Sequence, residues 1–157
     1  MDLLKHRSEK AIKNQELIKE ILDKDLVQRY RFGSLAEMTL IRELMLDKIM
    51  AEKLKTREDM EKLDKIKQVL SEYFYIENLE QLDHGDYIRY LSFNNNGNFE
   101  LKPGGQYVNT KDNFIILKSQ NISKTEKVSF WKISDKTPIF CKLDDNDKMI
   151  LVLMDYR

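Results

Sequence analysis

The sequence contains little that would cross-link, bend or embed the chain. Among its 157 residues are one cysteine, two prolines and five glycines. The single cysteine, Cys141, cannot form an internal disulfide, which favours a reducing compartment. No apolar run approaches the roughly 18 residues that a membrane-spanning helix needs, and the first residues become charged at once. We therefore expect a soluble cytoplasmic protein that neither carries a signal peptide nor enters a membrane.

The sequence also lacks a net charge. Lysines and arginines equal aspartates and glutamates, at 27 each. Residues 1–82 carry 16 basic and 17 acidic side chains, and residues 83–157 carry 11 and 10. Neither half has the positive field that is typical of a nonspecific nucleic-acid or membrane binder. With 41% hydrophobic and 34% charged residues, the composition is that of a globular protein rich in exposed helix.

Motifs that carry chemistry are missing as well. The acidic run at residues 144–147 lacks the glycine and the glutamate of an EF-hand loop. The two histidines, His6 and His84, have no second ligand at metal-binding spacing. Gly104 and Gly105 precede no basic helix of a phosphate loop, and no serine or cysteine occupies a nucleophile elbow. The sequence therefore predicts no catalytic residue, no metal site and no cofactor, and we expect a protein that is not an enzyme.

What the sequence does contain is a change of apolar period near residue 85. Apolar residues over 3–31 recur as in an amphipathic helix, and Leu4, Ala11 and Ile18 fall seven residues apart, as at a coiled-coil seam. The apolar stripe is narrow and needs a facing surface. We therefore expect the helical half to form a homo-oligomer, most simply a dimer.

Two helix-capping signals follow this first segment. Ser34–Glu37 fits a capping box and predicts a helix over residues 35–55. Thr56–Asp59 repeats the signal with a shorter acid, and an apolar seam continues over residues 60–74. Residues 35–74 therefore form either one long helix or two helices, and the sequence leaves both open.

After residue 85 the apolar period falls to two. Turn signals rich in asparagine and glycine stand at residues 94–98, 103–105 and 111–113. Five or six short strands at this spacing suggest a small antiparallel barrel of the SH3-like kind. The stretches with strand character are residues 87–92, 99–101, 106–108, 114–118, 128–133 and 139–143.

The predicted fold class is therefore α+β. Long N-terminal helices, as a hairpin or a three-helix coiled-coil-like segment over residues 3–76, precede the small antiparallel SH3-like β barrel and a short C-terminal helix. The expected domains are a helical region at 1–82 and a β-barrel module at 83–157. The acids at 144–147 are suited to cap the last helix. A closing strand over 149–154 is the alternative.

Aromatic residues gather beside basic ones in the β half, and three aromatics with one arginine form the candidate partner-binding surface: Tyr87, Arg89, Trp131 and Tyr90. Strand alternation places Tyr87 and Arg89 on one face and Tyr90 on the other. Of the neighbours Phe130 and Trp131, one must face inward and one outward. We interpret the chain as a noncatalytic interaction or structural protein, with helices for assembly and a barrel that recognises a protein partner. A nucleic-acid-binding module that uses the barrel aromatics and basic residues is the alternative.

Three segments of the β half resemble a group of viral proteins. The run Leu82–Tyr90, the Gly104–Gly105 turn and the ending Ile139–Leu143 with Asp147–Tyr156 are similar to small uncharacterised proteins of nucleocytoplasmic large DNA viruses. The resemblance covers about half the chain. It implies a location in the host cytoplasm or the virion, and it implies no activity and no site residues.

Overall fold

The computed structural model describes residues 32–119 and 127–154. The predicted first helix, with its heptad seam over residues 3–31, lies outside these residues. The chain divides into two compact units, one of residues 1–38 and 144–157 and the other of residues 39–143. Each unit is described by itself below.

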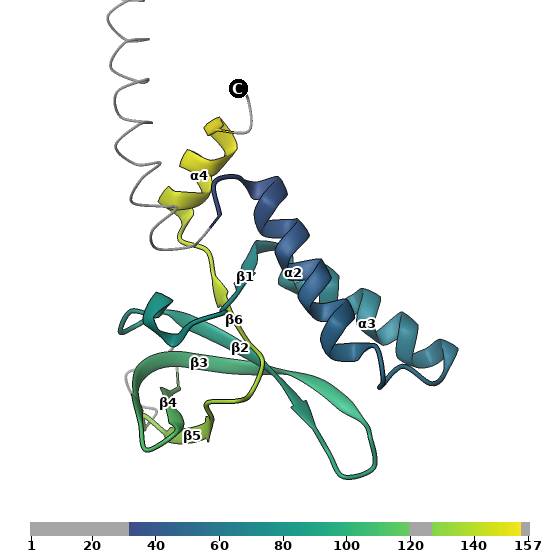
Figure 1. Ribbon diagram of the computed structural model, residues 1–157. Coiled ribbons are helices and arrows are strands. Elements are labelled where there is room, and N and C mark those ends of the chain that lie inside the picture. Colours follow the sequence, from purple (N-terminus) through teal and green to yellow (C-terminus); the bar gives the residue numbers. More distant parts are fainter. Residues whose placement is uncertain (1–31, 120–126, 155–157) are drawn as a thin grey trace, which may run out of the picture. The chain divides into compact units, whose positions relative to one another are not determined.

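The fold class is α+β, as predicted, and the described strands form one six-stranded antiparallel sheet. Its strand order is β1-β6-β2-β3-β4-β5 (Figure 1). The helical elements are α2 (Leu35–Met50), α3 (Arg57–Val69), η1 (Leu70–Glu72), η2 (Leu79–Gln81) and α4 (Asp145–Met154). The strands are β1 (Tyr73–Tyr75), β2 (Tyr87–Phe93), β3 (Phe99–Lys111), β4 (Phe114–Lys118), β5 (Phe130–Ser134) and β6 (Ile139–Lys142).

Residues 35–74 contain two separate helices, which settles the alternative that the sequence left open. α2 ends at Met50, five residues before the predicted end, in a turn that is closed by the Lys53 N–H donating to the Met50 carbonyl oxygen at 2.9 Å. The start of α3 has the predicted capping box. The Asp59 N–H donates to Thr56 Oγ1 at 3.1 Å, and the Thr56 N–H donates to Asp59 Oδ2 at 3.2 Å. The shorter acid therefore suffices as the reciprocal partner.

The cap of α2 differs from the predicted box in one bond. The Glu37 N–H donates to Ser34 Oγ at 3.1 Å, as expected, but the Glu37 carboxylate accepts the N–H of Gly33 at 3.0 Å. The acid still satisfies a backbone donor just before the helix, so both groups of the cap have a partner.

The prediction that the helical seam continues through Tyr73 and Phe74 is wrong. The helix tightens into η1 and the next three residues form β1, which pairs with β6 in the register Tyr73↔Lys142 and Phe74↔Cys141. Aromatic residues have high strand propensity, and the ladder with β6 satisfies their backbone groups. The strand conformation of this segment depends on a partner strand almost seventy residues away. A local apolar pattern cannot indicate such a distant pairing.

The prediction of a turn at residues 103–105 is also wrong, because these residues lie inside the 13-residue strand β3. Gly104 has φ +73°, and a Cβ there would lie 1.7 Å from the carbonyl oxygen of Ile88. The glycine lets β3 change direction without reversing. The first part of β3 pairs with β2 and the second part with β4, and Gln106 faces both neighbours.

The other two predicted turns are confirmed. The hairpin between β2 and β3 is closed by the Asn94 N–H donating to the Asn98 carbonyl at 2.9 Å, with Gly97 at φ +81°. The turn between β3 and β4 uses Asp112 at φ +54° and Asn113 at φ +67°. Consecutive positive φ angles are what a tight hairpin turn requires, and asparagine and aspartate tolerate them best after glycine.

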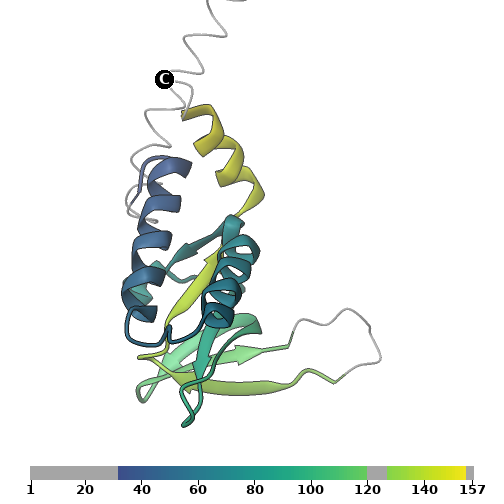
Figure 2. The ribbon, with the colours of Figure 1, turned by 90° about the vertical axis from the view of Figure 1, so that its right-hand side faces the viewer.

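α2 and α3 lie side by side and pack on one face of the sheet (Figure 2). Burying each large apolar side chain in such a core contributes about 1.5–3 kcal/mol. The core cluster consists of Leu46, Met50, Leu63, Ile66, Leu70, Tyr73, Leu91, Phe99 and Phe140.

The predicted closed barrel is not observed. β5 and β1 are the two ends of the strand order, and no ladder joins β5 to β6 or to β1 among the described residues. The C-terminal segment is helical, which confirms the predicted helix over the alternative strand. Asp144 caps it, since the Asn146 N–H donates to Asp144 Oδ1 at 2.8 Å.

Candidate partner-binding surface

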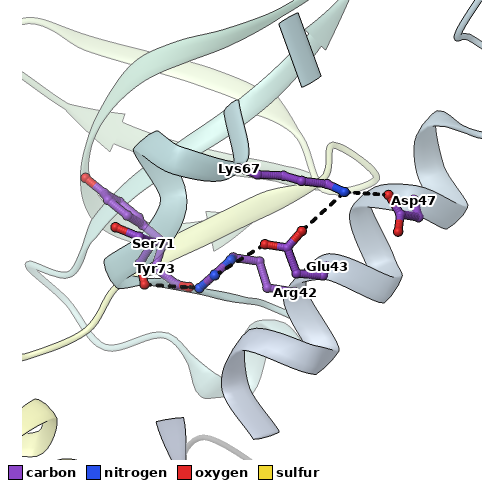
Figure 3. Close-up of polar contacts among 6 residues, drawn as sticks. All are labelled: Arg42, Glu43, Asp47, Lys67, Ser71 and Tyr73. Carbon is purple, nitrogen blue, oxygen red and sulfur yellow. Dashed lines mark hydrogen bonds and ion pairs between the residues drawn. The ribbon is translucent and has the colours of Figure 1, made fainter. Parts of the chain in front are cut away.

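A buried arginine fixes α2 to the start of the sheet (Figure 3). Arg42 is 3% exposed, and its Nη1 donates to the carbonyl oxygens of Ser71 at 3.2 Å and Tyr73 at 3.1 Å. These carbonyls belong to η1 and β1, where the chain passes from helix to strand. The guanidinium therefore satisfies backbone groups that neither a helix nor the sheet would satisfy.

An ion-pair network joins the same helix to α3. Lys67 Nζ lies 2.8 Å from Asp47 Oδ1 and 3.3 Å from Glu43 Oε2, and Arg42 Nη2 lies 3.5 Å from Glu43 Oε1. The hydrogen bond with Asp47 raises the pKa of Lys67, so this amine stays charged at neutral pH. Figure 3 shows all these groups turned toward one another across the two helices, and we interpret the network as structural.

Two of the four predicted site residues, Tyr87 and Arg89, contact their own chain. The Tyr87 hydroxyl donates to the Pro103 carbonyl oxygen, and its ring packs against the helix-covered core, with its centroid 6.4 Å from that of Tyr73. Arg89 Nε donates to the Lys102 carbonyl oxygen at 3.2 Å. Burial is the main cause that raises the pKa of Tyr73 beside them. These contacts stabilise the bend of β3 and leave Tyr87 only partly exposed.

Trp131 faces inward. It stands opposite Leu117 in the β4–β5 ladder, and a Cβ at Gly105 would lie 2.6 Å from its Cη2 atom. The indole therefore lies directly over Gly105 of β3, and there is room for it because glycine has no side chain. Its neighbour Phe130 faces outward and is 64% exposed. Of this adjacent pair, Phe130 is the residue that is exposed to solvent.

The outward side chains of β4 and β5 form a surface that we call the Phe130 face: Phe114, Ile116, Lys118, Phe130 and Lys132. Phe114 is 37% exposed, and Lys132 Nζ lies 4.3 Å above its ring centroid. The inward side chains Ile115 and Leu117 are fully buried. β4 and β5 lie at the end of the sheet away from α2 and α3 (Figure 1), so these helices do not cover the Phe130 face.

Tyr90, the fourth predicted site residue, lines an open pocket of about 540 Å³. The pocket lies between the end of β2 and the turn that joins β5 to β6. Aromatic and aliphatic groups make up most of its wall, and hydroxyls and one lysine complete it. We call it the Tyr90 pocket, and its lining residues are Tyr90, Leu91, Ser92, Phe93, Ile133, Ser134, Lys136, Thr137 and Pro138.

Of the four predicted site residues, Tyr90 is therefore the one that lines a pocket, and the prediction did not include the exposed aromatics of β4 and β5. The available signal was the alternation itself. In the run 114–118 the central Ile115 and Leu117 had to share one face, which leaves Phe114 on the other. The pattern does not tell which of the two faces is covered, and that choice depends on how β3 bends.

Other kinds of site are not seen in the described part of the chain. No three His, Cys, Asp or Glu side chains within residues 32–119 and 127–154 come together as a metal site would require. None of the helices described is both long and apolar enough to cross a membrane. No protein family, curated protein or solved structure was found to match the chain.

Proposed function

We propose that the protein is a noncatalytic interaction protein that recognises a protein partner through the Phe130 face. The observation that carries this proposal is Phe130 itself, a large aromatic side chain that is 64% exposed beside a second exposed aromatic, Phe114. Clustered exposed aromatics cost solubility and are typical of binding surfaces, where such residues contribute most of the affinity. The lysines at their border, Lys118 and Lys132, would keep the face soluble when it is empty.

The arrangement of β2 to β6 supports a finer proposal about the fold. Without β1, the strand order is β6-β2-β3-β4-β5, and the long β3 is shared between two halves of the sheet. Only four residues connect β5 to β6, although three strands separate them in the sheet. Such a curled meander is what an SH3-like barrel has before its last edge closes. We propose an opened SH3-like arrangement, a fold that presents binding surfaces in unrelated proteins.

The direct test is capture of partners from the native source by the full chain and by two variants. Phe130→Ala removes the exposed ring without touching the core, and Met60→Ala, at a residue 58% exposed on α3, is the matched control. We expect a partner that the wild type and Met60→Ala retain and that Phe130→Ala loses at least tenfold. Equal capture by all three proteins would contradict the proposal.

A nucleic-acid-binding module is the second candidate, because two lysines border the same exposed aromatic rings. Bases stack on aromatic side chains and phosphates pair with lysines. The balanced charge of the whole chain disfavours it. Salt distinguishes the two candidates. Binding to single-stranded DNA falls steeply as salt rises from 50 to 200 mM, whereas contact through apolar groups does not.

We also propose that helices mediate assembly of the chain. In α2 the side chains of Leu40 and Leu44, one turn apart, are 57% and 58% exposed. An apolar pair at this spacing is suited to pack against the same pair of a second copy. Light scattering of the wild type and of Leu44→Lys tests this, and a strictly monomeric wild type at high micromolar concentration would refute it.

A further inference from the structure

β5 offers a row of backbone groups that have no partner among the described residues. The Asp135 N–H donates to the Asn113 carbonyl at 3.0 Å, and the Ser119 N–H donates to the Ser129 carbonyl at 2.8 Å. In an antiparallel ladder the bonded positions alternate, so the odd-numbered residues of β5 bond to β4. The N–H groups of Phe130, Lys132 and Ser134 consequently point away from β4, toward the free edge.

The same edge leads into the Tyr90 pocket. Ser134 and Ile133, the last residues of β5, are among the residues that line it. The Ser134 carbonyl already accepts the Thr137 N–H at 3.0 Å, so the turn after β5 closes on itself and leaves the edge before it open. A strand laid along β5 would therefore present its inward side chains toward the pocket and its outward ones beside Lys132.

The charge of the edge limits what can pair with it. The charged side chains of β4 and β5 are Lys118 and Lys132, and the acids Asp112 and Asp135 lie beyond the strand ends. In a second copy paired antiparallel about its centre, Lys132 would face Lys132 directly, which is unfavourable. A strand with acidic residues on its outward side would instead place a negative charge beside Lys132, which is favourable. The charge thus disfavours self-pairing and favours an acidic partner.

Resting on the proposed function, we propose that the partner is an extended acidic peptide segment that adds a seventh strand to the free edge of β5. Its backbone pairs with Phe130, Lys132 and Ser134, its acidic side chains lie beside Lys132, and an apolar side chain of the opposite face enters the Tyr90 pocket. Main-chain pairing gives the affinity in such complexes, and alternate side chains give the specificity.

The test uses the full chain and blocked seven-residue peptides in which valine or isoleucine alternates with glutamate, beside a matched set with lysine in place of each glutamate. The informative pair of variants is Lys132→Pro and Lys132→Ala. Both remove the charge, but only proline removes the outward N–H, which β4 does not use. We expect the wild type to prefer the glutamate set by at least tenfold. Lys132→Pro should bind about tenfold more weakly than Lys132→Ala, as the loss of a hydrogen bond in a partly dry interface allows.

A second measurement covers the case in which Lys132→Pro does not fold. Saturating the wild type with the best glutamate peptide should slow hydrogen exchange at the N–H groups of Phe130, Lys132 and Ser134. Unchanged exchange, equal binding of the two peptide sets, or preference for single-stranded oligothymidylate or for a second copy would each overturn the inference. A native partner lost on Phe130→Ala but bound equally by Lys132→Pro and Lys132→Ala overturns strand addition and leaves the proposed function intact.

Discussion

Two regions of this sheet meet very different surroundings. The strands under α2 and α3 place Leu91, Phe99 and Phe140 against the helices, and each is at most 2% exposed. The hairpin of β4 and β5 is just as apolar, yet Phe114 and Phe130 remain on its outward face. An aromatic residue on a strand therefore does not by itself show whether it belongs to the core or to the surface. Under α2 and α3 such rings are core, whereas at β4 and β5 the outward rings stay exposed and only the inward side chains, such as Ile115 and Leu117, are buried.

We expect the largest difference in stability between two variants that each remove one phenylalanine, one from each region. Phe140→Ala should lower the free energy of unfolding by about 3–5 kcal/mol, since the ring is fully buried in the helix-covered core. Phe130→Ala should change it by about 0.5 kcal/mol or less, because the ring is already in solvent. Urea denaturation of both variants beside the wild type measures the difference. A similar loss for the two would mean that the Phe130 face is covered.

The next test concerns the polar side of the helix-covered region. Arg42→Met keeps most of the side-chain volume but leaves the Ser71 and Tyr73 carbonyls without their donor, at an expected cost of about 2–3 kcal/mol. Glu43→Gln is the control, because this half-exposed side chain should contribute under about 1 kcal/mol. Thermal melts rank the two. A stability of Arg42→Met equal to the wild type would show that water replaces the guanidinium.

A third test examines the inward side of the β4–β5 hairpin. Gly105→Ala puts a methyl group 2.6 Å from Trp131 Cη2 and 2.5 Å from the Lys118 carbonyl oxygen, so the ring must move. We expect a loss of about 1–3 kcal/mol, as for other overpacked sites. The protein has a single tryptophan, so its fluorescence reports this site alone. Emission should shift to the red in Gly105→Ala, and an unchanged spectrum would place the indole elsewhere.

Local signals predicted the parts of this fold that local chemistry determines. Thr56 and Asp59 cap a helix through bonds within four residues, and the asparagine-glycine turn after β2 needs only its own φ angles. β1 was missed because its pairing partner, β6, lies far away in the sequence. The sequence predicted a turn at Gly104 because glycine permits either a turn or a bend within a strand. The bend is favoured by the neighbouring strand, whose Ile88 carbonyl oxygen lies close to Gly104.

The residues of the candidate surface could not be chosen from the sequence for the same reason. Alternation correctly separates Phe130 from Trp131 and Tyr87 from Ile88, but it leaves the choice of inward face open. That choice follows from two long-range facts, the curl of β3 and the helices on β2. The side chains of Tyr87 and Arg89 consequently donate hydrogen bonds to the carbonyl oxygens of Pro103 and Lys102 on the neighbouring strand. Of the adjacent pair Phe130 and Trp131, Phe130 is the exposed ring, and the sequence could not tell which of the two it would be.

The smallest expected effects lie at the exposed start of α3, which supports the helix-covered region from its edge. Thr56→Ala removes the hydroxyl that accepts the Asp59 N–H and should cost about 1 kcal/mol. The partner acid adds a dependence on pH. The backbone N–H of Lys55, 3.0 Å from Asp59 Oδ2, is the main cause that holds the pKa of Asp59 below its usual value of 3.8.

Because that pKa is lowered on folding, the contribution of Asp59 is fully present above pH 3.8 and is lost as pH falls through the folded value. Asp59→Asn should therefore make stability less dependent on pH below about 4, with little change in the slope at pH 7. Asp64→Asn, on the exposed side of the same helix, is the matched control for removing one carboxylate from α3. Urea midpoints between pH 2.5 and 7 measure all three proteins, and parallel acid limbs would mean that the carboxylate contributes no more than the amide.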